Sequence, residues 1–379
     1  MTDQYVALIE LPTGSLGAHR VGVADGVITS MQPTDEKPDL RILPGLADIH
    51  NHGAVGESFP NSDLDGCRAA ARYHRLRGTT TLLASTVSLP ENLLLPQLSV
   101  LADLTDLGEI DGIHAEGPFV NACRCGAQNP AAIIPGDPDL LSRMIEASRG
   151  HLKSITFAPE TARMRELVDM CAKHGIIVSF GHTDASFAEM NAAIIQAVDA
   201  GATVTATHLF NAMPPLHHRD PGAVAALVTA ATRGEAVVEL IADGVHLADD
   251  TVNMVLATVG ADRVTFVSDA MAAAGRADGQ YILGELDVTV AAGVARLSTS
   301  DGSEGAIAGG TSTVIEQVQR QVQHGRLLHD ALTAATTGHR LLGVEHRSRI
   351  EVGRPANFVV CGPDFTVRKV YREGQEVSP

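Results

Sequence analysis

The chain has 379 residues, of which 45% are hydrophobic and 19% charged, as in a large globular α/β protein with a sizeable core. Its formal net charge is −17, aromatic residues make up 3%, and tryptophan is absent. Nucleic-acid-binding surfaces are usually basic and carry stacking aromatics, so this composition argues against nucleic acid and against an anionic membrane as partners.

The N-terminal stretch MTDQYVALIELPTG lacks the basic and apolar regions of a secretory signal, and no run of about 18 apolar residues predicts a membrane span. The five cysteines are odd in number and scattered along the chain. This usage is typical of a reducing compartment, so we expect a cytoplasmic protein.

The two ends of the chain have the pattern of β-structure. In VGVADGVITSMQP (21–33), apolar residues alternate around a turn at Asp25-Gly26, which predicts a hairpin. The segment 350–377 has a strand-turn-strand pattern. We therefore expect residues 1–44 and 346–379 to meet in a small β-sandwich domain.

Between these ends, short apolar runs rich in β-branched residues alternate with helix-like segments such as 63–78 and 161–175. The predicted strands are 43–50, 79–86, 110–116, 154–160, 176–182, 203–208, 237–243 and 264–269. Eight strands alternating with helices predict a parallel (β/α)8 barrel, of the TIM type, over residues 45–345.

Potential metal ligands stand at the ends of five predicted strands. His50 and His52 end the first strand, and their spacing of two places both side chains on one side. The others are Glu116, His182, His208 and Asp269. The carboxyl ends of barrel strands converge on one mouth, and imidazole and carboxylate groups are usual ligands of zinc and its neighbours. A lone histidine is more often structural, but several ligands in register favour a divalent-metal site.

A metal at this mouth would activate water and polarise a carbonyl group. We expect Asp269 to act as acid and base, moving a proton from the attacking water to a leaving amine; a further ligand or a structural carboxylate are the alternatives. The pattern indicates metal-assisted hydrolysis of an amide or amidine carbon. For His114, a supporting position near the metal and a buried structural role remain open.

Several stretches resemble the amidohydrolase superfamily and, more narrowly, its N-acetylglucosamine-6-phosphate deacetylases. They are PGLADIHNHG (44–53), HAEGPFV (114–120), CGAQNP (125–130), FGHTDA (180–185), THLFNAMPPLHHRDPG (207–222), IADGVHL (241–247), VSDAM (267–271), IAGGTST (307–313) and GRPANFVV (353–360). The resemblance implies hydrolysis of the N-acetyl group of N-acetylglucosamine 6-phosphate, which yields glucosamine 6-phosphate and acetate.

The resemblance also implies roles for matching residues. Glu116, His182 and His208 would hold the catalytic metal. The expected substrate-binding residues are Gln128, Asn211, Ala212, Arg219, His246, Ala308 and Gly309. Arg219 would reach the sugar phosphate from a partner subunit, which implies a homodimer. Arginine suits phosphate through its planar, multi-donor group.

Two positions vary within the family or depart from its pattern. Some members carry Gln and Asn where this chain has His50 and His52, and those use one metal. Here the two histidines predict a two-metal or an alternative-metal site, with one or two divalent ions per chain. Zinc is the first expectation, and iron, manganese, cobalt and cadmium are alternatives. Gln128 stands where other members often carry a histidine beside the substrate, which leaves that contact open.

Other activities remain as alternatives. Many other amidohydrolases acting on cyclic amides bridge two metals with a carboxylated lysine at the end of the fourth strand. Here that strand ends in Phe157-Ala158-Pro159-Glu160, without a lysine. N-acetylgalactosamine 6-phosphate differs at a single hydroxyl, and the sequence does not separate the two epimers. A non-catalytic scaffold would predict broken ligand positions, which the sequence does not show.

Overall fold

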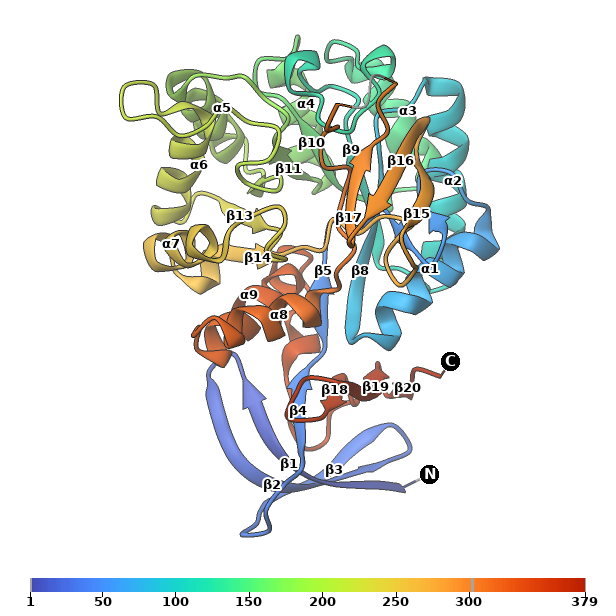
Figure 1. Cartoon of the computed structure of the whole chain (residues 1–379), viewed down its shortest axis with the longest axis vertical. Coiled ribbons are helices and arrows are strands. Elements are labelled where there is room, and N and C mark those ends of the chain that lie inside the picture. The colour runs from blue at the N-terminus through green and yellow to red at the C-terminus, as the bar shows by residue number, and fades with distance from the viewer. Residues whose placement is uncertain (1, 301–302, 379) are drawn as a thin grey trace.

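The computed structural model describes residues 2–300 and 303–378, and its main body is a parallel barrel (Figure 1). The eight predicted strands are present in the predicted order, each paired in parallel with the next. They are β5 (Leu46–Asp48), β8 (Thr79–Thr86), β9 (Gly112–Glu116), β10 (Leu152–Phe157), β11 (Ile177–Phe180), β12 (Val204–Ala206), β13 (Val237–Leu240) and β14 (Val264–Phe266). Several end earlier than expected, so His50, His182, His208 and Asp269 lie just beyond their strands.

Helices cover the outside of this barrel. They are α1 (Leu64–Leu76), α2 (Glu91–Asp106), α3 (Pro138–Ala147), α4 (Met164–His174), α5 (Phe187–Asp199), α6 (Gly222–Thr232), α7 (Asp249–Val259), α8 (Val314–Gln323) and α9 (Leu328–Leu341). The barrel strands are buried almost throughout, which explains why they read as continuous apolar runs rather than as alternating ones. None of the helices in the described ranges is both long and apolar enough to cross a membrane.

In the described part of the chain, β14 and β5 are not joined by a strand ladder, and side-chain and backbone hydrogen bonds close the barrel between them. The buried Asp48 carboxylate accepts hydrogen bonds from the Ser268 backbone N–H (3.0 Å) and the Ser268 hydroxyl (2.6 Å). The N–H of Asp269 donates to the carbonyl of His50 (2.9 Å). Helix α9 packs over the same junction at Gly338, where a β-carbon would come within 2.8 Å of Ala47. These contacts fix the first and last strands, and thus His50 and Asp269, relative to each other.

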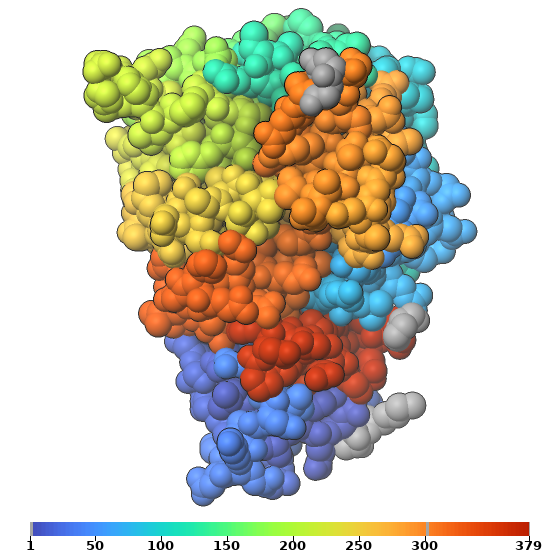
Figure 2. Space-filling view, in the orientation of Figure 1, coloured from blue at the N-terminus to red at the C-terminus, as the bar shows by residue number. Residues whose placement is uncertain are grey.

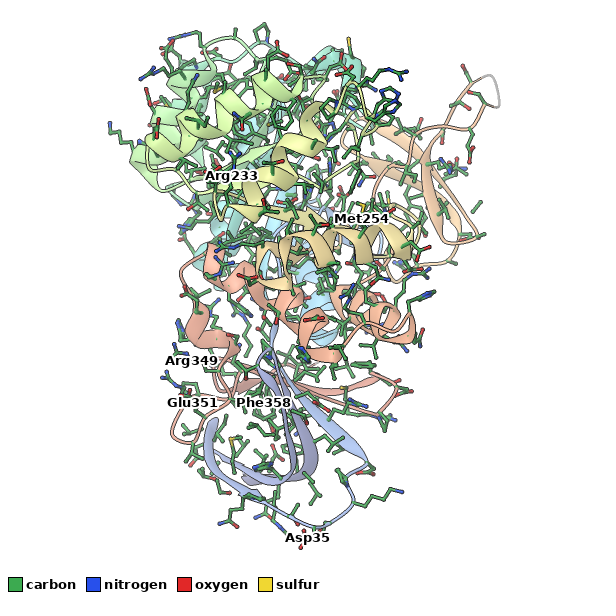
Figure 3. All side chains as sticks on the ribbon, turned by 90° about the vertical axis from the view of Figure 1, so that its left-hand side faces the viewer. Asp35, Arg233, Met254, Arg349, Glu351 and Phe358 are labelled. Carbon is green, nitrogen blue, oxygen red and sulfur yellow. The ribbon has the colours of Figure 1, made fainter. Side chains whose placement is uncertain are left out.

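The chain ends form the predicted β-domain below the barrel. Its seven strands make one continuous sheet in the order β20-β19-β18-β4-β1-β2-β3. Their bounds are β1 (Thr2–Leu11), β2 (Gly14–Ala24), β3 (Val27–Pro33), β4 (Leu40–Pro44), β18 (Phe358–Cys361), β19 (Val367–Arg372) and β20 (Gln375–Glu376). The predicted hairpin joins β2 to β3, and Asp25 (φ 49°) and Gly26 (φ 78°) take the left-handed backbone of its turn. Figure 3 shows Phe358 within this domain and Asp35 at its far end.

A small antiparallel sheet beside the barrel mouth was not predicted. It consists of β15 (Gly279–Leu283), β16 (Leu286–Ala291) and β17 (Val294–Leu297), which follow the eighth barrel strand. In the space-filling view, this orange segment covers part of the upper face of the barrel (Figure 2). The remaining short elements are β6 (Gly53–Ala54), β7 (Glu57–Ser58) and 3-10 turns at 122–124, 130–132, 261–263 and 345–348.

Candidate active site

The ends of the barrel strands surround a cavity of about 220 Å³ at the mouth. Most of the residues predicted for the site line it: His52, Glu116, Gln128, His182, His208, Asn211, Ala212, His246, Asp269, Ala308 and Gly309. His50 lies directly behind His52 and is fully buried. Leu283 of β15 adds an apolar wall, so the unpredicted sheet contributes to the cavity.

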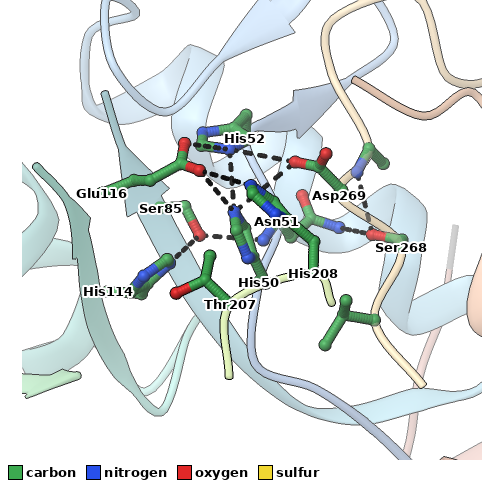
Figure 4. A network of polar contacts seen from close by, with 12 residues as sticks. His50, Asn51, His52, Ser85, His114, Glu116, Thr207, His208, Ser268 and Asp269 are labelled. Carbon is green, nitrogen blue, oxygen red and sulfur yellow. Dashed lines mark hydrogen bonds and ion pairs between the residues drawn. The ribbon is translucent and has the colours of Figure 1, made fainter. Parts of the chain in front are cut away.

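Glu116, the last residue of β9, directs its carboxylate at the histidine rings, and dashed lines in Figure 4 join its oxygens to them. Its Oε1 is 2.9 Å from His182 Nε2 and 3.0 Å from His208 Nε2. Its Oε2 is 3.3 Å from His52 Nε2. The carboxylate thus belongs to two groups with metal-binding geometry, one with His50 and His52 and one with His182 and His208.

Within each group the two ring nitrogens face each other at close range. The Nε2 atoms of His50 and His52 are 3.2 Å apart, and those of His182 and His208 are 3.1 Å apart. Two bare imidazole lone pairs repel at such distances, so a proton or a cation must lie between them. Imidazole and carboxylate donors are the ligands preferred by zinc and its first-row neighbours, so the donor set fits a divalent metal.

The backbone at these positions is strained. His182, His208 and Asp269 have φ values of 48°, 26° and 46°, in the left-handed region that residues other than glycine rarely adopt. Such strain costs about 1–3 kcal/mol per residue and is typical of functional sites. Here it turns three side chains at strand ends toward one cavity.

Two of the histidines are held in their orientation by hydrogen bonds at Nδ1, the ring nitrogen that faces away from the cavity. His182 Nδ1 donates to the carbonyl of Arg124 (2.9 Å), and His50 Nδ1 lies 3.0 Å from Glu239 Oε2. Each contact leaves Nε2 free for a metal. Glu239 also accepts from the N–H of His208 (3.1 Å) and is almost fully buried on β13. The sequence reading missed Glu239, although a carboxylate inside the apolar run VVELI (237–241) was a signal.

His114 has a structural position. Its Nδ1 contacts the Ser85 hydroxyl and its Nε2 the Thr156 hydroxyl, both at 2.9 Å. Its ring packs edge-on against His50, with 4.4 Å between the centroids. Burial, together with the charge of His50, holds the pKa of His114 well below its usual range. Both nitrogens are therefore occupied, and the ring supports His50 from behind.

The charges of the cluster stabilise one another. Burial opposes ionisation of Glu116, but the charges of His182 and His50 outweigh it and hold the pKa of Glu116 well below its usual range. Burial likewise opposes protonation of His50, yet the nearby Asp269 and Glu116 raise its pKa well above 6.5. The site therefore attracts positive charge, which a bound metal supplies in place of protons.

Asp269 lies between His52 and His246 at the mouth of the barrel. Its Oδ1 is 3.1 Å from His52 Nε2, and its Oδ2 is 3.9 Å from His246 Nε2. Burial would raise the pKa of Asp269, but the charge of His50 and the hydrogen bond from His52 lower it. The carboxylate is thus held in its ionised form beside the histidine cluster.

Gln128 contacts a predicted metal ligand. Its Oε1 accepts from the N–H of Ser88 (2.6 Å), so its amide nitrogen is the atom that donates to Glu116 Oε2 (2.6 Å). The side chain forms part of the cavity wall, yet its polar atoms hold Glu116 in place. Gln128 therefore orients the central carboxylate.

Arg219 lies outside the cavity of its own chain. It is exposed on the loop before α6, where its Nη1 contacts His218 Nε2 (2.7 Å). Among the described residues that line the cavity, none is lysine or arginine. The described cavity wall therefore offers a phosphate no lysine or arginine side chain of this chain.

Comparisons with known proteins agree with this architecture. The Amidohydrolase family profile matches residues 41–377. The N-acetylglucosamine-6-phosphate deacetylase of Bacillus subtilis is 32% identical over 367 residues, which cover 92% of this chain and 89% of that protein. The N-acetylgalactosamine-6-phosphate deacetylase of Escherichia coli O157:H7 is 28% identical, with 96% of both chains covered.

Solved structures give the same result. The N-acetyl-D-glucosamine-6-phosphate deacetylase of Mycobacterium smegmatis superposes with a TM-score of 0.87 at 33% identity over the whole of both chains. The enzyme of Thermotoga maritima gives 0.86 at 30% identity, with 100% of this chain and 99% of that chain covered. With its barrel, its Glu116-centred cluster and these relatives, the chain belongs to the amidohydrolase family, within the group of the N-acetylglucosamine-6-phosphate deacetylases.

Proposed function

We propose that this protein hydrolyses the N-acetyl group of N-acetylglucosamine 6-phosphate to glucosamine 6-phosphate and acetate. The observation that carries the proposal is the Glu116 cluster, which opens into a cavity with Asp269 at its edge. The names of the relatives support the substrate. The galactosamine relative makes N-acetylgalactosamine 6-phosphate the second candidate.

In this reaction, water forms a bond to the acetyl carbon and the amide C–N bond breaks. When bound at the cluster, a divalent metal lowers the pKa of water to about 7 and polarises the carbonyl. Asp269 accepts the proton of the attacking water and delivers it to the departing amine nitrogen. His246, whose side chain is 4% exposed, faces the same space and can hydrogen-bond the substrate.

The electrostatics of the cluster support a second metal. Glu116, Glu239 and Asp269 place three buried carboxyl groups around His50 and His52. Buried charges of one sign are costly unless cations compensate them. We propose that His50, His52 and Glu116 hold a second divalent ion, and that zinc is the native metal.

The shared use of Arg219 is also a proposal. Arg219 is exposed, and the described cavity lining contains no lysine or arginine. Both observations support a homodimer in which each Arg219 binds the phosphate in the partner's pocket.

The five free cysteines support a cytoplasmic location.

Acetate release tests the proposed function directly. The purified protein should release acetate from N-acetylglucosamine 6-phosphate, lose this activity after chelation, and regain it when zinc is returned. The unphosphorylated sugar and the galacto epimer serve as parallel substrates. Absence of acetate from all three sugars with metal bound would contradict the proposal.

Asp269→Asn should bind substrate almost normally but turn it over slowly. Asparagine keeps the size of the side chain and removes the proton acceptor, so kcat should fall by about 10²–10⁴-fold. Steady-state kinetics and equilibrium binding of the substrate separate the two effects. Turnover within a few-fold of the wild type would rule out Asp269 as the proton carrier.

His52→Gln should remove one of two metals. Zinc content, measured after removal of loosely bound ions, should fall from two equivalents per chain to one, because His182 and His208 keep their carboxylate. His151→Gln, which changes an exposed surface pair with Asp106, is the matched control. One equivalent in the wild-type protein would disprove the second site.

Arg219→Ala should chiefly raise KM for the phosphorylated sugar, because the phosphate is remote from the bond that breaks. Arg233→Ala, a change at another exposed arginine, controls for lost surface charge. Sedimentation at assay concentrations should show a dimer for all three proteins. A defect confined to kcat, or a fully active monomer, would contradict the shared site.

A further inference from the structure

A buried aspartate–histidine pair lies beside the Glu116 cluster, on the loop between β13 and α7. The side chains of Asp243 and His246 are 6% and 4% exposed, and Asp243 Oδ2 is 2.8 Å from His246 Nδ1. The other oxygen, Oδ1, accepts from the N–H groups of Val245 and His246, each at 2.8 Å. The carboxylate thus shapes the loop and contacts the ring at the same time.

This geometry determines which ring nitrogen carries the proton. A carboxylate can only accept hydrogen bonds, so His246 Nδ1 must donate to Asp243. In the neutral ring, Nε2 then bears the lone pair. That atom faces the cavity and lies 3.9 Å from Asp269 Oδ2.

We propose that Asp243 is a positioning residue, which holds His246 in the Nδ1–H tautomer and thereby presents Nε2 as an acceptor to the substrate. The inference rests on the proposed deacetylase function for its kinetic consequence. The tautomer itself is a property of the free protein.

The loop has supports that do not depend on this contact. The N–H of Ala242 donates to Gln317 of α8 (3.1 Å), and Gln321 donates to the carbonyl of Ala242 (3.3 Å). Arg320 of α8 forms a two-point ion pair with Asp249, at 2.8 and 2.7 Å. Because α8 braces the loop at both ends, the loop should keep its fold when the Asp243–His246 contact alone is altered.

Asp243→Asn separates the two roles of the carboxylate. The asparagine oxygen can still accept from the two N–H groups, as in other Asx turns. Its amide nitrogen must then face His246 Nδ1 and donate to it. The variant should therefore preserve the loop and invert the tautomer, so that Nε2 carries the proton.

The ring nitrogens can be observed directly. In zinc-loaded, ¹⁵N-histidine-labelled protein at alkaline pH, the His246 signals, assigned by their loss in His246→Gln, should show a protonated Nδ1. In Asp243→Asn they should show a protonated Nε2. Asp250→Asn, which alters an exposed carboxylate in the first turn of α7, should keep the wild-type pattern. An unchanged tautomer in Asp243→Asn would overturn the proposal.

Steady-state kinetics provide a second, independent test of the proposal. Asp243→Asn and His246→Gln should each lower kcat/KM for N-acetylglucosamine 6-phosphate by about 10²-fold, and the double variant should show no further loss. Asp250→Asn should stay near the wild type. Losses that multiply in the double variant would show that Asp243 acts independently of His246 and would overturn the proposal. If the wild-type protein releases no acetate, the proposed function fails, while the ¹⁵N spectra still decide the role of Asp243.

Discussion

The architecture of the mouth depends on one buried carboxylate. Glu116 is 3% exposed at the end of β9, and an isolated charge there would cost several kcal/mol. Nε2 atoms from three histidines lie within 3.3 Å of its two oxygens, and His50 lies 3.7 Å away. His182 and His208, whose backbone is strained, both direct Nε2 to the same oxygen of Glu116. Glu116 thus connects the ligand geometry to the strand ends of the barrel.

Closure of the barrel sets the distance between this cluster and Asp269, the proposed acid–base group. Asp48 binds Ser268 through both the backbone and the hydroxyl, and Asp269 follows directly. The N–H of Asp269 bonds to the carbonyl of His50, the first ligand of the chain. A change at the β14–β5 junction would therefore move Asp269 relative to the metal ligands, even though Asp48 lies outside the cavity.

The sequence predicted the barrel because parallel strands covered on both faces appear as short apolar runs, and all eight are present in order. It also predicted which residues gather at the mouth, because strand ends converge in this fold. The sequence did not predict which atoms hydrogen-bond to the site residues. That Gln128 holds Glu116, or that Glu239 holds His50, depends on side-chain directions across the barrel. The sheet β15–β17 was missed because its strands follow the eighth barrel strand, where a helix was expected.

The metal content of Glu116→Gln tests the central role of this carboxylate most directly. The amide keeps the size of the side chain but removes the negative charge that both histidine pairs share. The account predicts that zinc titration of the variant shows weakened affinity at both sites at once, with the fold retained by circular dichroism. Retention of one site at wild-type affinity would contradict it, because that site would then not depend on Glu116.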